Sequence, residues 1–241
     1  MSGHSHWATV KRGKEIEDKK RGKIFSKLSR MISVAAKEGG KNPESNSSLR
    51  IAIEQAKSAN MPKDNIERAI KRGVGELEGE KLEQVVFEAY GPGKTAIIIE
   101  GITDNKNRAL LEIKQILSQN NGKLANEGSV KWLFERKGFL MIDNKEKTTE
   151  NEELELAVIE AGAEDIKWQE DILEIYTKPD DLEKVKKNLE EKKIKVGSAS
   201  LDWVAKEIIE VNEKNKQSCE KLFEALDEND AVQDIYSNLK L

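Results

Sequence analysis

The sequence GFLMIDNKEKTTENEELELAVIEAGAEDIKWQEDILEIYT spans residues 138–177 and mixes short apolar runs with one longer stretch of helical spacing. β-branched and aromatic residues, which are typical of strands, recur in the short runs at 138–142, 165–169 and 172–177. Between the first two runs, residues 152–161 carry apolar side chains at helical spacing, and Gly162 follows as a helix end. The stretch therefore predicts strand, helix, strand, strand.

The pattern continues beyond Thr177. Pro179 and Asp180 open a second predicted helix that runs to about Lys192, and residues 195–205 return to strand character. Residues 135–205 thus have the order β-α-β-β-α-β, which is that of a ferredoxin-like split unit.

Fragments on either side of this unit are incomplete separately. Before it the sequence predicts two strands joined by a turn at Gly91-Pro92-Gly93-Lys94, then a helix and a short strand, over 85–90, 95–102, 107–119 and 123–125. After it the sequence predicts a strand, a helix and a short strand, over 206–211, 217–226 and 232–236. We infer that these fragments form one domain and that the unit at 135–205 is inserted into it.

The first third of the chain predicts three short helices. Residues 23–37 form one amphipathic helix, and a second begins after the capping cluster Asn46-Ser47-Ser48. The third begins around Pro62, where Asp64 and Glu67 have the spacing of a capping box. Such short helices are stable only when packed together.

The predicted fold class is therefore α+β, with an N-terminal three-helix domain and two ferredoxin-like α/β domains, the third inserted into the second. The predicted domain boundaries are 1–78, 79–134 plus 206–241, and 135–205.

Charge is distributed unevenly along the 241 residues. The whole chain has a formal net charge of −4, yet residues 1–75 contain 17 Lys and Arg against 8 Asp and Glu, a net of +9. The remaining residues hold 24 basic and 37 acidic side chains, a net of −13. This asymmetry favours a polyanionic partner for the first third, although lysine-rich helices are also often only solvated surfaces.

Several classes of protein are disfavoured by the sequence. No apolar run approaches the about 20 residues of a membrane span, and the first ten residues contain no apolar core of a signal peptide. A single cysteine, Cys219, allows neither an internal disulfide nor a structural zinc site. We expect a cytoplasmic protein without a membrane partner.

No pattern supports catalysis. The two histidines, His4 and His6, both lie at the N-terminus, so neither a metal site nor a Ser-His-Asp arrangement is indicated. Gly93-Lys94-Thr95 resembles the end of a phosphate-binding loop, but Glu88 stands where that loop needs glycine. We expect no enzyme activity, no cofactor, no metal and no small-molecule substrate.

Basic residues around one tryptophan are the candidate nucleic-acid-binding residues. Lysine and arginine neutralise phosphates, and an aromatic ring stacks on an unpaired base. The alternative for Trp7 is that it packs against the helices. The alternative for the basic arm is that it is only a solvated tail. The candidates are Ser5, Trp7, Lys11, Arg12, Lys14, Lys20, Arg21, Lys23, Lys27, Arg30, Lys63, Arg68, Lys71 and Arg72. Among them Lys23, Lys27 and Arg30 fall on one helix face, away from the apolar one.

Long motifs in residues 3–134 resemble the YebC/PmpR family, which includes mitochondrial translational activators of cytochrome oxidase. They are Gly3-His4-Ser5 with Trp7 and Lys11, Arg21–Phe25, Asn60–Gly73, Tyr90–Gly93, Thr103–Asn105 with Asn107-Arg108, and Gly128–Val130 with Phe134. The resemblance implies a helical domain followed by two α/β domains, and members are widely described as probable DNA-binding transcriptional regulators. His6 stands where the family usually has lysine, and Lys94 where it has glycine.

Three functions stay open at this point. The first is a DNA-binding transcriptional regulator that places the basic helix after Asn60 in a major groove. The second is a ribosome-associated RNA-binding translation factor, since a basic arm with one tryptophan suits irregular RNA. The third is a protein-interaction scaffold without a nucleic-acid role. The partner is then DNA, ribosomal RNA or the ribosome, and we expect a monomer because no dimerisation heptads are visible.

Overall fold

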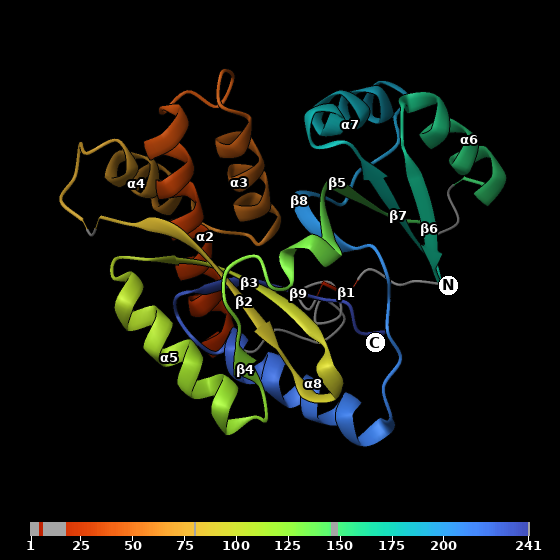
Figure 1. The fold of residues 1–241 in the computed structure, drawn as a ribbon. Helices are drawn as coiled ribbons and strands as arrows, with labels where there is room; N and C mark the ends of the chain where they lie inside the picture. The colour runs from red at the N-terminus through yellow and green to blue at the C-terminus, as the bar shows by residue number, and fades with distance from the viewer. Residues whose placement is uncertain (1–4, 7–17, 80, 146–148, 241) are drawn as a thin grey trace. The chain divides into compact units, whose positions relative to one another are not determined.

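The structure is a computed structural model and describes residues 5–6, 18–79, 81–145 and 149–240. The described chain divides into two compact units, residues 135–204 and the remaining described residues. It combines an N-terminal helical part with two sheet parts (Figure 1).

The helical part contains α2 (Asp18–Gly39), α3 (Ser47–Ser58) and α4 (Lys63–Gly73). Its core is formed by side chains such as Ile32, Leu49 and Ala56, which are fully buried. Asn46 caps α3 as expected, since its side chain accepts a hydrogen bond from the Leu49 N–H at 3.0 Å. The predicted capping box of α4 is wrong, because Pro62 is the N-cap and no side chain bonds there.

Helices α2 and α4 pack most closely at Gly73. A Cβ atom at this position would lie 2.2 Å from the carbonyl oxygen of Ser33, so only glycine allows the two backbones to approach. The Ser33 hydroxyl also donates to the Ala69 carbonyl at 2.8 Å, which fixes the same crossing.

We predict opposite effects of two glycine-to-alanine changes. Gly73→Ala is expected to lower the free energy of unfolding by about 1–3 kcal/mol, because the backbones must separate. Gly22→Ala, within α2, is expected to raise it by about 0.5–1 kcal/mol, because its Cβ meets nothing within 4 Å and glycine is a poor helix former. Urea unfolding of both variants measures these changes. Equal changes in the free energy of unfolding would contradict the close packing at Gly73.

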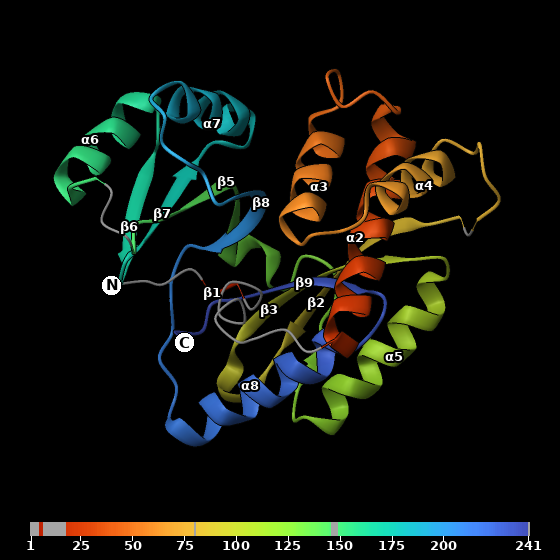
Figure 2. The same ribbon diagram turned by 180° about the vertical axis from the view of Figure 1, so that it is seen from behind.

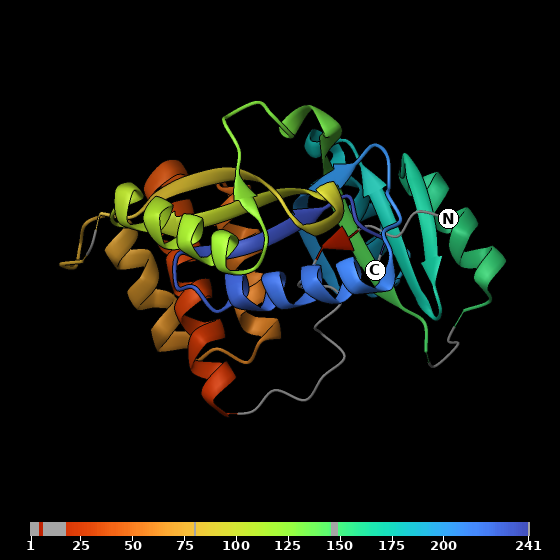
Figure 3. The same cartoon turned by 60° about the horizontal axis from the view of Figure 1, so that its bottom comes forward.

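The first sheet has the strand order β1-β9-β3-β2-β4, and every neighbouring pair is antiparallel. Its strands are β1 (Ser5–His6), β2 (Glu83–Tyr90), β3 (Ala96–Thr103), β4 (Lys123–Leu124) and β9 (Val232–Ser237). Helices α5 (Lys106–Gln119) and α8 (Glu213–Asp227) lie side by side on one face and share a core with β2, β3 and β9 (Figure 3).

This sheet differs from the prediction in two ways. Apart from β1, its strands lie in the order β9-β3-β2-β4 with the β2–β3 hairpin at the centre, which is not the strand order of a ferredoxin-like sheet. The predicted strand at 206–211 is wrong, since in the described chain only Ile209 forms an isolated bridge, to Leu239. The turn before β3 is confirmed, with Gly93 and Lys94 both at positive φ.

The second sheet has the order β6-β7-β5-β8, and its element order β-α-β-β-α-β is the predicted one. Its strands are β5 (Phe134–Asp143), β6 (Asp165–Gln169), β7 (Ile172–Thr177) and β8 (Ser198–Ala205). Helices α6 (Asn151–Ala161) and α7 (Leu182–Glu191) pack against each other and cover one face (Figure 2). Strand β7 pairs antiparallel with both neighbours, as in a ferredoxin-like unit.

Candidate nucleic-acid interface

The candidate residues of the N-terminal arm are only partly within the described chain. Trp7, Lys11, Arg12 and Lys14 lie outside the described residues. Ser5 belongs to β1 and is paired with Ser237, and Lys20 lies in the first turns of α2.

The expected solvent-facing position of Lys23, Lys27 and Arg30 is wrong. The Lys27 ammonium forms an ion pair with Asp227 at 2.8 Å, and only 16% of its side chain is exposed. Arg30 donates to the carbonyl oxygen of Asp230. Burial and the neighbouring Lys27 charge lower the pKa of Lys23, against the opposing effect of nearby carboxylates. This face of α2 therefore packs against the acidic segment formed by the end of α8 and the residues that connect it to β9.

Because this contact is internal, we predict that Lys27→Ala affects stability rather than binding. Removing one partner of a mostly buried pair is expected to lower the free energy of unfolding by about 1–2 kcal/mol. Affinity for nucleic acid is expected to stay within about threefold of the wild-type value. Asp227→Asn serves as the second single variant of a double-mutant cycle in urea. A Lys27→Ala variant that is as stable as the wild type but binds nucleic acid weakly would contradict this prediction. It would show that this face of α2 contacts nucleic acid.

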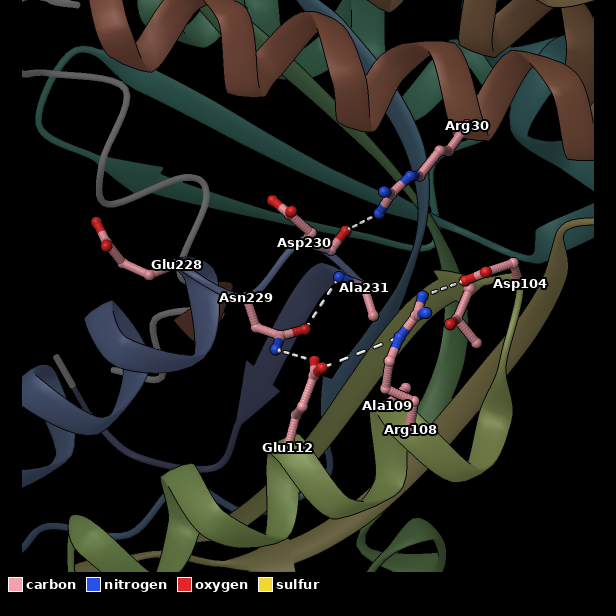
Figure 4. Close-up of a pocket in the computed structure, with 10 residues that line it drawn as sticks. Arg30, Asp104, Arg108, Ala109, Glu112, Glu228, Asn229, Asp230 and Ala231 are labelled. Atoms are coloured by element: carbon pink, nitrogen blue, oxygen red, sulfur yellow. Dashed lines mark hydrogen bonds and ion pairs between the residues drawn. The ribbon is translucent and has the colours of Figure 1, made fainter. Parts of the chain in front are cut away.

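A polar hollow of about 380 Å³ lies beside this contact (Figure 4). Its charged groups already satisfy one another, since Arg108 pairs with Asp104 and reaches Glu112 at 4.0 Å. Glu112 also accepts a hydrogen bond from the Asn229 amide at 2.8 Å. With Arg108 paired to carboxylates and Arg30 bonded to a backbone carbonyl, the hollow is a poor site for a polyanion.

The motif at residues 103–108 has a structural role at the edge of this hollow. Asn105 caps α5, because its side-chain oxygen accepts a hydrogen bond from the Arg108 N–H at 3.0 Å. The Thr103 hydroxyl accepts in turn from the Asn105 N–H at 3.1 Å. These bonds shape the connection between β3 and α5.

Arg21 is exposed on α2, and helix α4 presents the remaining candidates to solvent. Lys63, Arg68, Lys71 and Arg72 are all exposed, whereas Ile66 and Ala69 on the opposite side are buried. Lys63 lies 3.5 Å from Glu67, one turn later. In the described part of the chain, Arg68, Lys71 and Arg72 form no side-chain hydrogen bond or ion pair. We call Arg68, Lys71 and Arg72 the α4 basic cluster.

The connection from α3 to α4 is short, and it is fixed by packing against the helical core. It consists of four residues, 59–62, in which Asn60 has a φ of 58° and Met61 is buried in the helical core. Two helices joined by such a turn have the outline of a helix-turn-helix, with α4 in the position of the second helix.

Sequence reasoning missed one ordered loop. The buried Glu88 carboxylate of β2 accepts hydrogen bonds from the N–H groups of Gly128, Val130 and Lys131, at 2.6, 2.6 and 2.9 Å. Burial would raise the pKa of Glu88, but the three N–H donors outweigh burial and hold the pKa below its ordinary value. No local pattern around residue 88 indicates this contact, since the donors lie 40 residues later.

Among the described residues, no three His, Cys, Asp or Glu side chains gather closely enough to hold a metal ion. No helix of the described chain is both long and apolar enough to cross a membrane.

Fold and surface together define a mixed helix-and-sheet protein with a basic helical domain at its N-terminus. The model of the TACO1/YebC protein N-terminal domain matches residues 5–76, and that of the TACO1/YebC second and third domain matches residues 82–239. The chain therefore belongs to the TACO1/YebC family.

Relatives of known sequence and structure agree with this assignment. A "probable transcriptional regulatory protein" of Halothermothrix orenii is 50% identical, over 100% of this chain and 96% of its own length. The probable transcriptional regulatory protein YrbC of Bacillus subtilis is 43% identical over the full length of both chains. The crystal structure of a conserved hypothetical protein from Aquifex aeolicus superposes with a TM-score of 0.86 at 45% identity, covering 92% of this chain and 91% of that one.

Proposed function

We propose that the protein is a nucleic-acid-binding regulator of gene expression and that it binds DNA through the α4 basic cluster. One observation carries this proposal. Arg68, Lys71 and Arg72 are exposed along a helix whose other side is buried, and in the described chain their side chains form no hydrogen bond or ion pair. Such cations are available to neutralise phosphates and to release their counterions.

The form of the helical domain favours DNA. Helix α4 follows α3 after a short turn, and a second helix in that position enters the major groove in helix-turn-helix proteins. The relatives' names, which describe probable transcriptional regulatory proteins, fit this target. We place the protein in the cytoplasm as a monomer that needs no cofactor and performs no catalysis.

Binding to ribosomal RNA as a translation factor is the second candidate. It is favoured by two exposed aromatic side chains on the first sheet domain, Tyr90 and Trp132. Single-stranded regions of RNA are recognised by stacking on such rings, which duplex DNA does not require.

The proposal is tested by measuring affinity for a short DNA duplex and a single-stranded RNA over a series of salt concentrations. The logarithm of affinity is expected to fall linearly with the logarithm of salt, by about 0.9 for each duplex phosphate neutralised. Tighter duplex binding supports the DNA regulator, and tighter RNA binding supports the translation factor. Affinity that does not depend on salt contradicts both, and favours the scaffold.

A further inference from the structure

Two large aromatic side chains lie exposed at one end of the first sheet. Trp132, in a single 3-10 turn (Lys131–Leu133), exposes 65% of its surface, and Tyr90, the last residue of β2, exposes 38%. Single exposed apolar residues are ordinary, but two exposed aromatic rings anchored to one loop form a surface that suits a flat ligand.

Both rings are anchored to the same backbone oxygen. The Tyr90 hydroxyl donates to the Ser129 carbonyl at 3.2 Å, and the Trp132 indole N–H donates to that carbonyl at 3.0 Å. The hydrogen-bond donor of each ring is thereby already bonded to the protein backbone. The polar atoms of the two rings meet at one carbonyl oxygen, and much of the rings' apolar surface is left to solvent.

The loop that carries the shared oxygen is itself fixed. Glu88 accepts from the N–H groups of Gly128, Val130 and Lys131, which flank or adjoin Ser129. Val130 is fully buried, so the loop is pinned by its side chain as well. A site that is already ordered loses little conformational entropy when it binds.

Lysines gather around the two rings. The Lys206 ammonium donates to the Trp132 carbonyl at 2.9 Å, Lys131 precedes the tryptophan and is exposed, and Lys123 is the register partner of Tyr90. Exposed carboxylates at Glu127 and Glu207 leave a small positive excess. The rings therefore supply most of the affinity, and the lysines favour an anionic ligand over a neutral one.

We propose that Trp132 and Tyr90 form a stacking site for an unpaired base of single-stranded nucleic acid, separate from the α4 basic cluster. This inference rests on the proposed function. Base stacking on an aromatic ring accepts any base, whereas the phosphates beside the base meet Lys206 and Lys131. A duplex offers no unpaired base, so the site distinguishes single strands from duplexes.

The test compares Trp132→Ala with the wild-type protein, using oligouridine, oligothymidine and a DNA duplex as probes. Loss of one stacked base is expected to weaken binding of both single strands by about 5- to 100-fold, with duplex affinity unchanged. The salt slope should stay the same, because no charge is removed. A stronger loss with oligouridine than with oligothymidine identifies RNA as the source of the base.

Two controls separate stacking from a general effect. Trp132→Phe keeps an aromatic ring and is expected to restore most of the affinity while abolishing the fluorescence quenching that a stacked base causes at Trp132. Leu111→Ala removes a side chain on α5 that is 66% exposed, and is expected to change nothing. Unchanged affinity of Trp132→Ala for both single strands overturns the stacking site and leaves the proposed function intact. A wild-type protein that binds no probe overturns both.

Discussion

Replacing Arg68, Lys71 and Arg72 together by alanine is expected to weaken binding to nucleic acid by 100- to 1,000-fold at low salt. At about 50 mM salt, each phosphate that a cation neutralises contributes roughly tenfold, because counterions are released into dilute solution. The slope of log affinity against log salt should become shallower by about two to three. Fluorescence anisotropy with a labelled duplex measures both quantities.

The fold is expected to survive this change, because the three side chains project away from the buried face formed by Ile66 and Ala69. A matched control removes three exposed lysines from the other compact unit, Lys178, Lys184 and Lys187. This control changes the net charge by the same amount as the α4 triple variant, and it should weaken nucleic-acid binding far less than that variant does. Equal losses in the two triple variants would mean that overall charge, and not the α4 basic cluster, drives binding.

Replacing Glu88 by alanine is expected to lower the free energy of unfolding by about 3 kcal/mol at neutral pH. The carboxylate accepts three backbone N–H groups, and without it the buried Val130 N–H has no acceptor. Glu88→Gln keeps the shape but replaces one acceptor oxygen by a donor, so a loss of about 2 kcal/mol is expected. Urea unfolding monitored by circular dichroism measures both losses.

The same contact has a defined pH dependence. The folded pKa of Glu88 is lower than the ordinary value of 4.5, so its stabilising contribution is complete above that value. The contribution disappears as pH falls through the lowered folded pKa. The stability difference between wild type and Glu88→Gln should therefore narrow below about pH 4. A difference that is constant over this range contradicts an ionised Glu88.

Local sequence patterns correctly predicted the features of the fold that depend on residues close together in the chain. The capping of α3 by Asn46 and the turn at Gly93 follow from side chains within a few residues, and both are present. The β-α-β-β-α-β order of the second sheet also follows from apolar spacing along one continuous segment. Each of these features depends on contacts close in sequence.

Sequence patterns did not predict the contacts between segments that are distant along the chain. A helical wheel gives the direction of Lys27 around its axis, but not the acidic segment 200 residues later that covers it. The sequence predicts the β2–β3 hairpin that leads the first sheet, but not the strand order β1-β9-β3-β2-β4. Among the candidate residues, the exposed face of α4 followed from its apolar spacing, whereas the anchored pair of Tyr90 and Trp132 did not, since one carbonyl joins them across 42 residues.

The most direct test of the central claim is to crosslink the protein to nucleic acid in living cells, and to identify both the attached sequence and the crosslinked peptide. Our account predicts nucleic acid above background, promoter-proximal DNA among it, and crosslinks within the peptide that contains Arg68, Lys71 and Arg72. Discrete ribosomal RNA sites in place of DNA would keep nucleic-acid binding but contradict the transcriptional target. Background levels of all nucleic acid, or crosslinks confined to residues 135–204, would contradict binding through the helical domain.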